Sequence, residues 1–101
     1  MMDAVTLGRW GCGWFFLVAL LTGIWKYRSI ITSPDAKAPV YVDIAHRAAF
    51  LYAFSCLLLV HFAALSKWPE SWNMWGIAIS LFFFATAHST YLIHGVLRDT
   101  D

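Results

Sequence analysis

Charged side chains are scarce in this chain: Asp, Glu, Lys and Arg together make up 13% of its 101 residues. A soluble domain usually carries about 25% charged residues. The sequence also has no run of basic residues and a net charge of only +1, so its composition gives no support to nucleic-acid binding. Because a small domain buries only part of its surface, a soluble fold would expose much of the 60% hydrophobic content to water. We therefore expect an integral membrane protein in contact with the lipid bilayer.

Cysteine is scarce too, and its spacing fits neither a metal site nor a disulfide framework. The two cysteines, Cys12 and Cys56, would differ in depth by roughly 10 Å in the helices we expect. A disulfide needs Cα atoms within about 7 Å of each other, so we expect two separate thiols that pack as small apolar residues. The sequence shows no nucleophile–base pair and no complete set of metal ligands. We therefore assign no catalytic residue and expect no catalytic activity of its own.

Three long apolar stretches dominate what the chain does contain. We expect a single all-α transmembrane domain over residues 1–101, with helices at about 8–28, 43–66 and 71–97. These lengths suit a bilayer crossing, which takes about 17–25 residues, and three crossings give an antiparallel up-down-up bundle. The one sizeable surface loop is expected at about 26–42. Asp43 is expected to cap the second helix, because its carboxylate can accept from free backbone N–H groups.

The basic residues are divided unevenly between the two ends of these helices. One end has two of them, Arg9 and Lys67. The other end has five: Lys26, Arg28, Lys37, Arg47 and Arg98. Since cytoplasmic segments are enriched in Lys and Arg, the larger group predicts a cytoplasmic 26–42 loop and C-terminus, with the N-terminus outside. We expect a multi-pass protein of a bacterial inner membrane.

The spacing of small and polar residues predicts which helix faces meet, because helices in lipid associate through small residues and polar contacts. At 100° per residue, one side of the third helix carries Gly76, Ser80, Phe83, Ala87, Tyr91 and His94. We expect that side to face the bundle. His88 lies about 120° away from it. In the second helix, His46 and His61 fall on the side that carries alanines.

Histidines at one end of the helices suggest a cofactor site. His46 and His94 would differ in depth by only about 3–5 Å, and His88 lies somewhat deeper. Two histidines on facing membrane helices can ligate a haem iron, so His46 with His94, or with His88, is a candidate pair for haem b. Arg47 is then placed to pair with a propionate, and Tyr91 to contact the ring. This layout is similar in architecture to small membrane anchors of respiratory complexes, which hold haem b or quinone.

Two other interpretations use the same residues. Asp43, His46 and His94 would give two imidazoles and a carboxylate, a set typical of Fe(II). The simpler alternative is structural: Asp43 and Arg47 form an i,i+4 ion pair, and the histidines bond to backbone carbonyls or neighbouring hydroxyls.

Three functions follow from these patterns. The first is an accessory or structural subunit of a larger membrane complex, such as a respiratory or redox complex, that binds other membrane subunits or itself. The second is an electron-transfer anchor that binds haem b or quinone through His46 and His94. The third is a small oligomeric transporter or channel, suggested by polar residues within the spans. These are His61, Ser80, Thr86 and Ser89.

Overall fold

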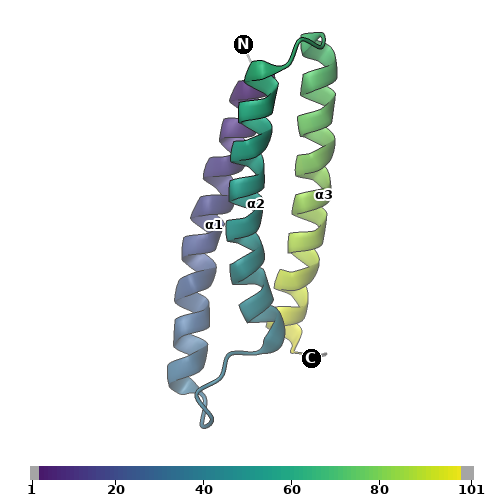
Figure 1. The fold of residues 1–101 in the computed structure, drawn as a ribbon. Coiled ribbons are helices and arrows are strands. Elements are labelled where there is room, and N and C mark those ends of the chain that lie inside the picture. The colour runs from purple at the N-terminus through teal and green to yellow at the C-terminus, as the bar shows by residue number, and fades with distance from the viewer. Residues whose placement is uncertain (1–2, 99–101) are drawn as a thin grey trace.

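Three long helices run in alternating directions, each antiparallel to the helix before it in the chain (Figure 1). The structure is a computed structural model that describes residues 3–98. Helix α1 is Ala4–Thr32, α2 is Val40–Leu65 and α3 is Glu70–Leu97, and the described chain contains no strand. Each helix is long and apolar enough to cross a membrane. The predicted all-α, up-down-up arrangement of three membrane-spanning helices is therefore confirmed.

Short polar and proline signals set where each helix begins. Asp3 caps α1, since its carboxylate accepts from the Thr6 backbone N–H at 2.7 Å. Helices α2 and α3 each follow a proline, Pro39 and Pro69, with φ near −55°, a value that suits entry into a helix. Asp43 lies one turn inside α2, where its backbone N–H bonds to the Pro39 carbonyl at 3.2 Å. The prediction that Asp43 caps this helix was wrong, because the proline already starts it.

The loop between α1 and α2 covers only residues 33–39, not the predicted 26–42. Helix α1 continues past its apolar stretch, and its polar side chains are satisfied there. The hydroxyls of Ser29 and Thr32 donate to carbonyls one turn earlier, at 2.9 and 2.7 Å. Lys26 forms an ion pair with Asp43 at 2.6 Å. Hydropathy marks the part of a helix that can lie in lipid, but it does not mark where the helix ends.

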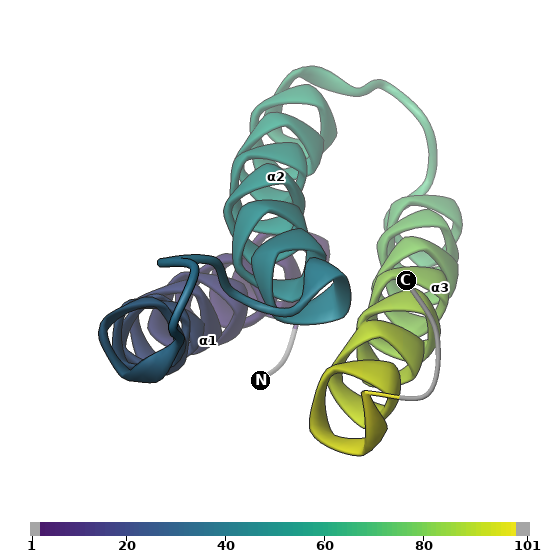
Figure 2. The same cartoon turned by 90° about the horizontal axis from the view of Figure 1, so that it is seen from below.

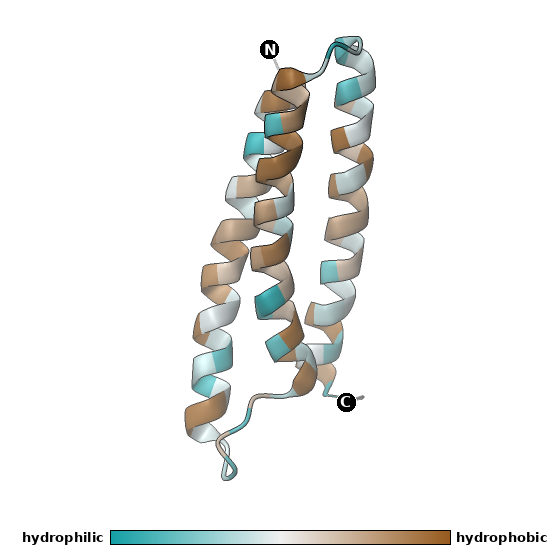
Figure 3. Cartoon of the chain, viewed as in Figure 1, coloured by the Kyte–Doolittle hydropathy of each residue, from teal (hydrophilic) through white to brown (hydrophobic). Residues whose placement is uncertain are grey.

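Helices α1 and α2 pack closely, while α3 stands further from the pair (Figure 2). The close approach uses glycine: a Cβ atom at Gly8 would lie 2.5 Å from Val60 Cγ2. In the apolar stretches of α1 and α2, 28% of residues are buried, against 11% in α3. Hydrophobic residues also cover the outward faces of the helices (Figure 3). Such helices, apolar on all sides, are typical of membrane spans.

The middle of the bundle is a small aromatic and thiol core. Phe15, Ala53 and Cys56 are buried together, and Cys12 packs against them. Tyr52 joins this core through an edge contact with Phe15, with ring centroids 5.5 Å apart. The predicted 10 Å depth difference between the cysteines was therefore wrong, because α1 lies at a different height against α2 than the sequence suggested. Both cysteines are free thiols.

The rotation of α3 also differs from the prediction. Its buried residues are Ile77, His88 and Gly95, whereas Gly76 and Phe83, both expected to face the bundle, are exposed. Gly95 faces inward because a Cβ atom there would lie 2.9 Å from the Trp25 ring. The large side chains of α1 and α2 thus set the face of α3 that fits, rather than the line of small residues along α3 itself.

Candidate functional site

Most of the candidate residues lie toward the end of the bundle that contains the 33–39 loop, which we call the lower end (Figure 1). His46 projects from α2 against α1. Its Nδ1 atom lies 2.9 Å from the Ala19 carbonyl oxygen and 3.4 Å from the Thr22 hydroxyl. Because a carbonyl only accepts, Nδ1 donates in this bond, and the neutral ring keeps a lone pair on Nε2. His46 therefore ties α2 to α1 and retains one possible ligand atom.

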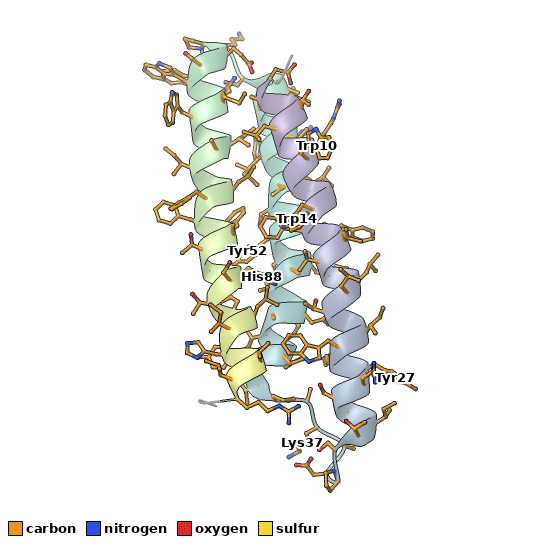
Figure 4. All side chains as sticks on the ribbon, turned by 180° about the vertical axis from the view of Figure 1, so that it is seen from behind. Trp10, Trp14, Tyr27, Lys37, Tyr52 and His88 are labelled. Atoms are coloured by element: carbon orange, nitrogen blue, oxygen red, sulfur yellow. The ribbon has the colours of Figure 1, made fainter. Side chains whose placement is uncertain are left out.

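His88 ties α3 to α2 in the same manner. It is only 4% exposed, and its Nε2 atom lies 2.8 Å from the Ala45 carbonyl oxygen. Its ring makes edge contacts with Phe15 and Tyr52, each with centroids 6.2 Å apart. Figure 4 shows His88 and Tyr52 together in the middle of the bundle. The face that the sequence pattern placed away from the bundle therefore carries its most buried histidine.

His94 and His46 contact different parts of the bundle. The His94 ring lies beside Tyr41 of α2, with centroids 5.4 Å apart. The Tyr91 ring lies beside the same Tyr41 ring, with centroids 6.2 Å apart. The His46 ring instead packs on α1 and on Phe50, at 5.2 Å. The predicted haem pair thus has its two rings in separate contacts, one on the α1–α2 side and one on the α2–α3 side.

A charge network joins α1 and α2 at the lower end. The Asp43 carboxylate binds Lys26 at 2.6 Å and Arg47 at 2.9 Å. The predicted Asp43–Arg47 ion pair is confirmed. Within residues 3–98, no group of three or more His, Cys, Asp or Glu side chains is placed to hold a metal ion. Asp43, His46 and His94 are therefore not gathered into one ligand set.

Two of the predicted cofactor residues lie in one groove between α2 and α3. Arg47 and Tyr91 line it, together with Tyr52 and the apolar side chains of Ile44, Ala48 and Leu51. The groove has a volume of about 250 Å³. We call it the α2–α3 groove. Its lining combines one basic residue, two tyrosines and apolar side chains.

Sequence reasoning missed Tyr52 and Glu70. Tyr52 could have been found from periodicity, because it follows Ile44 and Ala48 at intervals that repeat on one helix face. Glu70 begins α3, and its carboxylate accepts from the Ala4 backbone N–H of α1 at 2.5 Å. No local pattern indicates this contact, since 66 residues separate the two.

Hydrogen bonds favour the ionised form of Asp3 and Asp35, which lie outside the spans. At Asp3, the bond from the Thr6 backbone N–H lowers the pKa of the carboxyl below its usual value. At Asp35, the Ser33 hydroxyl has the same effect on the pKa. Negative charge at Asp3 also suits the N-terminus of α1, where the helix dipole is positive.

Comparisons with known proteins add no information on this site. No protein-family model, curated protein or solved structure matches the chain.

Proposed function

We propose that this small multi-pass membrane protein is an accessory or structural subunit of a larger membrane complex, and that α3 is the helix that docks on the partner. The main support is the uneven packing of the bundle. In the apolar stretch of α3 only 11% of residues are buried, against 28% in each of the other helices. A helix that makes so few contacts within its own chain has most of its surface available for another protein.

The outer face of α3 has features that suit a helix partner. Trp75, Ile79, Phe82 and Phe83 are all exposed there, and with Ala78 they line a shallow apolar groove of about 460 Å³. Exposed hydroxyl residues follow further along α3; the Thr86 hydroxyl, for example, donates to the Phe82 carbonyl at 2.8 Å. Each hydroxyl oxygen can still accept a bond from a neighbouring helix. Small and hydroxyl residues of this kind are enriched where membrane helices meet.

The histidine contacts also support a structural role. His46 and His88 each use one ring nitrogen to bond a backbone carbonyl of the neighbouring helix. Hydrogen bonds between helices strengthen packing in lipid, where water does not compete. Two of the four histidines are thus explained by assembly of the bundle, without a cofactor.

Photo-crosslinking in the native membrane tests the docking face. A photoreactive residue replaces Phe83 on α3, and the control replaces Ile24, which is similarly exposed on α1. We expect crosslinks from position 83 to a larger membrane protein, and mainly lipid adducts from position 24. Equal yields of protein crosslinks from both positions would refute the assignment of α3 as the docking helix. Adducts of twice the chain mass from position 83 would instead support the oligomeric transporter or channel.

A second candidate, an electron-transfer anchor, is favoured by the α2–α3 groove. Arg47 and Tyr91 carry N–H and O–H donors of the kind that bind quinone carbonyl oxygens, and both residues line this groove. His46 has an anchored Nδ1 and a lone pair on Nε2, which is the usual arrangement for a metal or haem ligand. Its predicted partner His94 packs on Tyr41. The geometry therefore favours quinone over a haem b held by His46 and His94.

A lipid extract and a visible spectrum of the purified protein test this second candidate. Quinone in the extract that falls in the Arg47→Gln variant, but not in Lys67→Gln, would support the groove as its site. A Soret band that is lost in His46→Ala would support haem. Absence of both signals after supplementation with quinone and haem would exclude the anchor function.

We also propose that the lower end faces the cytoplasm, because five of the seven basic residues belong to that end. Single cysteines introduced at Lys37 and Lys67, in a variant without the native cysteines, test the orientation. In intact cells an impermeant thiol reagent is expected to label position 67 and not position 37. The reverse pattern would refute it.

A further inference from the structure

Helix α1 contains four glycines, and packing within the bundle explains three of them. A Cβ atom at Gly8, Gly11 or Gly23 would lie between 2.4 and 2.9 Å from a side chain of α2 or α3. At Gly13 a Cβ atom would meet nothing within 4 Å. Glycine is unfavourable inside a helix by about 1 kcal/mol relative to alanine, and packing within the bundle does not offset this cost at position 13.

Gly13 forms the floor of a groove on the outer surface of α1. The indole rings of Trp10 and Trp14, both labelled on α1 in Figure 4, belong to its lining. Thr6, Arg9 and Leu17 complete the lining, and the volume is about 510 Å³. This size lies within the range of about 300–1,000 Å³ that is typical of ligand sites. The missing side chain at Gly13 is what keeps the groove open.

The groove changes from polar to apolar along the helix axis. Thr6 and Arg9 lie nearest the end of α1 that begins at Ala4, and Leu17 lies deeper in the apolar stretch. The distance from Thr6 to Leu17 is about 16 Å along a helix. A phospholipid lying beside the helix has the same order, with its phosphate at the membrane surface and its acyl chains inside. Tryptophans such as Trp10 are also the residues that typically lie at headgroup level.

Arg9 supplies the charge complementarity. It is exposed, and within residues 3–98 its guanidinium has no ion-pair partner. At the bilayer surface the nearest anion is a lipid phosphate, and a guanidinium group binds phosphate oxygens through paired N–H donors. An unpaired cation at the rim of an apolar groove fits a lipid better than a second helix, which would bring no phosphate.

We propose that this α1 groove binds one anionic phospholipid, with its phosphate on Arg9 and an acyl chain lying over Gly13 and against the two indole rings. This site is separate from the docking face of α3 and does not depend on the function proposed above. It would give the protein a fixed lipid partner in the leaflet opposite the lower end.

Native mass spectrometry of the detergent-purified chain, titrated with phosphatidylglycerol, tests the site. Gly13→Leu fills the groove, and Gly76→Leu is its control, since a Cβ atom at Gly76 also meets nothing within 4 Å. We expect Gly13→Leu to weaken binding of the first lipid by at least about tenfold, because leucine occupies the space of the acyl chain. Arg9→Gln should weaken it about fivefold, the effect of one basic residue near the surface. Lys67→Gln, an exposed cation near the same surface, should leave the affinity unchanged.

Further arms separate the possible occupants. Diacylglycerol, which lacks the phosphate, should bind the wild type about as weakly as phosphatidylglycerol binds Arg9→Gln. Displacement of the lipid by inorganic phosphate would overturn the proposal in favour of a free-anion site. A wild-type dimer that Gly13→Leu dissociates would overturn it in favour of a second copy of the chain. Equal lipid affinity in Gly13→Leu and Gly76→Leu would also refute it, and circular dichroism confirms that the compared variants keep their helices. If Gly13→Leu loses helix, equal phosphatidylglycerol affinity of Arg9→Gln and the wild type refutes the proposal.

Discussion

Replacement of His88 measures how much one buried imidazole contributes to the bundle. His88→Phe keeps a ring of similar shape but loses the 2.8 Å bond to the Ala45 carbonyl. That carbonyl still accepts from its own helix, so no backbone group is left without a partner. The expected loss is therefore that of one hydrogen bond between membrane helices, about 0.6–1.7 kcal/mol of unfolding free energy. His88→Ala also removes the ring from its contacts with Phe15 and Tyr52, which raises the expected loss to about 2–5 kcal/mol.

The measurement is unfolding of the purified protein in mixed micelles of rising SDS content, followed by circular dichroism. His61 provides the matched control, because it is exposed on α2. His61→Phe and His61→Ala should both leave the transition within about 0.5 kcal/mol of the wild type. Equal stability of His88→Phe and His61→Phe would show that the hydrogen bond contributes nothing. A His88→Ala variant as stable as His88→Phe would refute the argument that the ring fills space between three helices.

Three further predictions concern other contacts. Gly23→Ala should lose about 1–3 kcal/mol of stability in the same assay, since the new Cβ atom would lie 2.9 Å from the hydrogen-bonded His46 ring. A loss of stability no larger than that of Gly76→Ala would contradict this prediction. Asp43→Asn breaks two partly exposed ion pairs and should cost about 0.4–2 kcal/mol, less at high salt; a loss independent of salt would argue against charge pairing. Because the folded pKa of Asp3 is lowered by its cap hydrogen bond, the cap should stabilise α1 above about pH 4 and lose this effect as pH falls through the lower folded pKa. An NMR titration that gives Asp3 an unshifted pKa would refute that cap.

Hydropathy predicted the three spans because lipid imposes length and composition on each helix separately. It could not predict the rotation of α3, since that helix is apolar on nearly all sides. Its rotation depends on long-range shape: room at Gly95 for the Trp25 ring and a carbonyl within reach of His88. Small residues are a necessary feature of a packed helix face in lipid, but several faces of α3 carry them, so the pattern alone does not choose one.

The candidate site was predictable where its contacts are local. The Asp43–Arg47 pair follows from i,i+4 spacing, whereas Lys26 reaches Asp43 from another helix. Depth matching grouped the histidines by counted height alone and could not give the direction in which each side chain points. Height follows from counting residues, yet the direction of a side chain depends on how each helix is rotated in the bundle. His46 therefore faces α1, a contact that its depth could not reveal.

The bond from Ala4 to Glu70 has a consequence for the order of biogenesis. The first N–H groups of a helix lack partners within it, and the Ala4 N–H finds its acceptor at the start of α3. A ribosome delivers α1 and α2 first, so these two can pair as a hairpin while Ala4 still bonds to water. Only when α3 follows does the Glu70 carboxylate close this end of the bundle. Helix α3 thus completes the hydrogen bonding of the first turn of α1. In a chain truncated before Glu70, α1 would lie in the membrane without this acceptor for the Ala4 N–H.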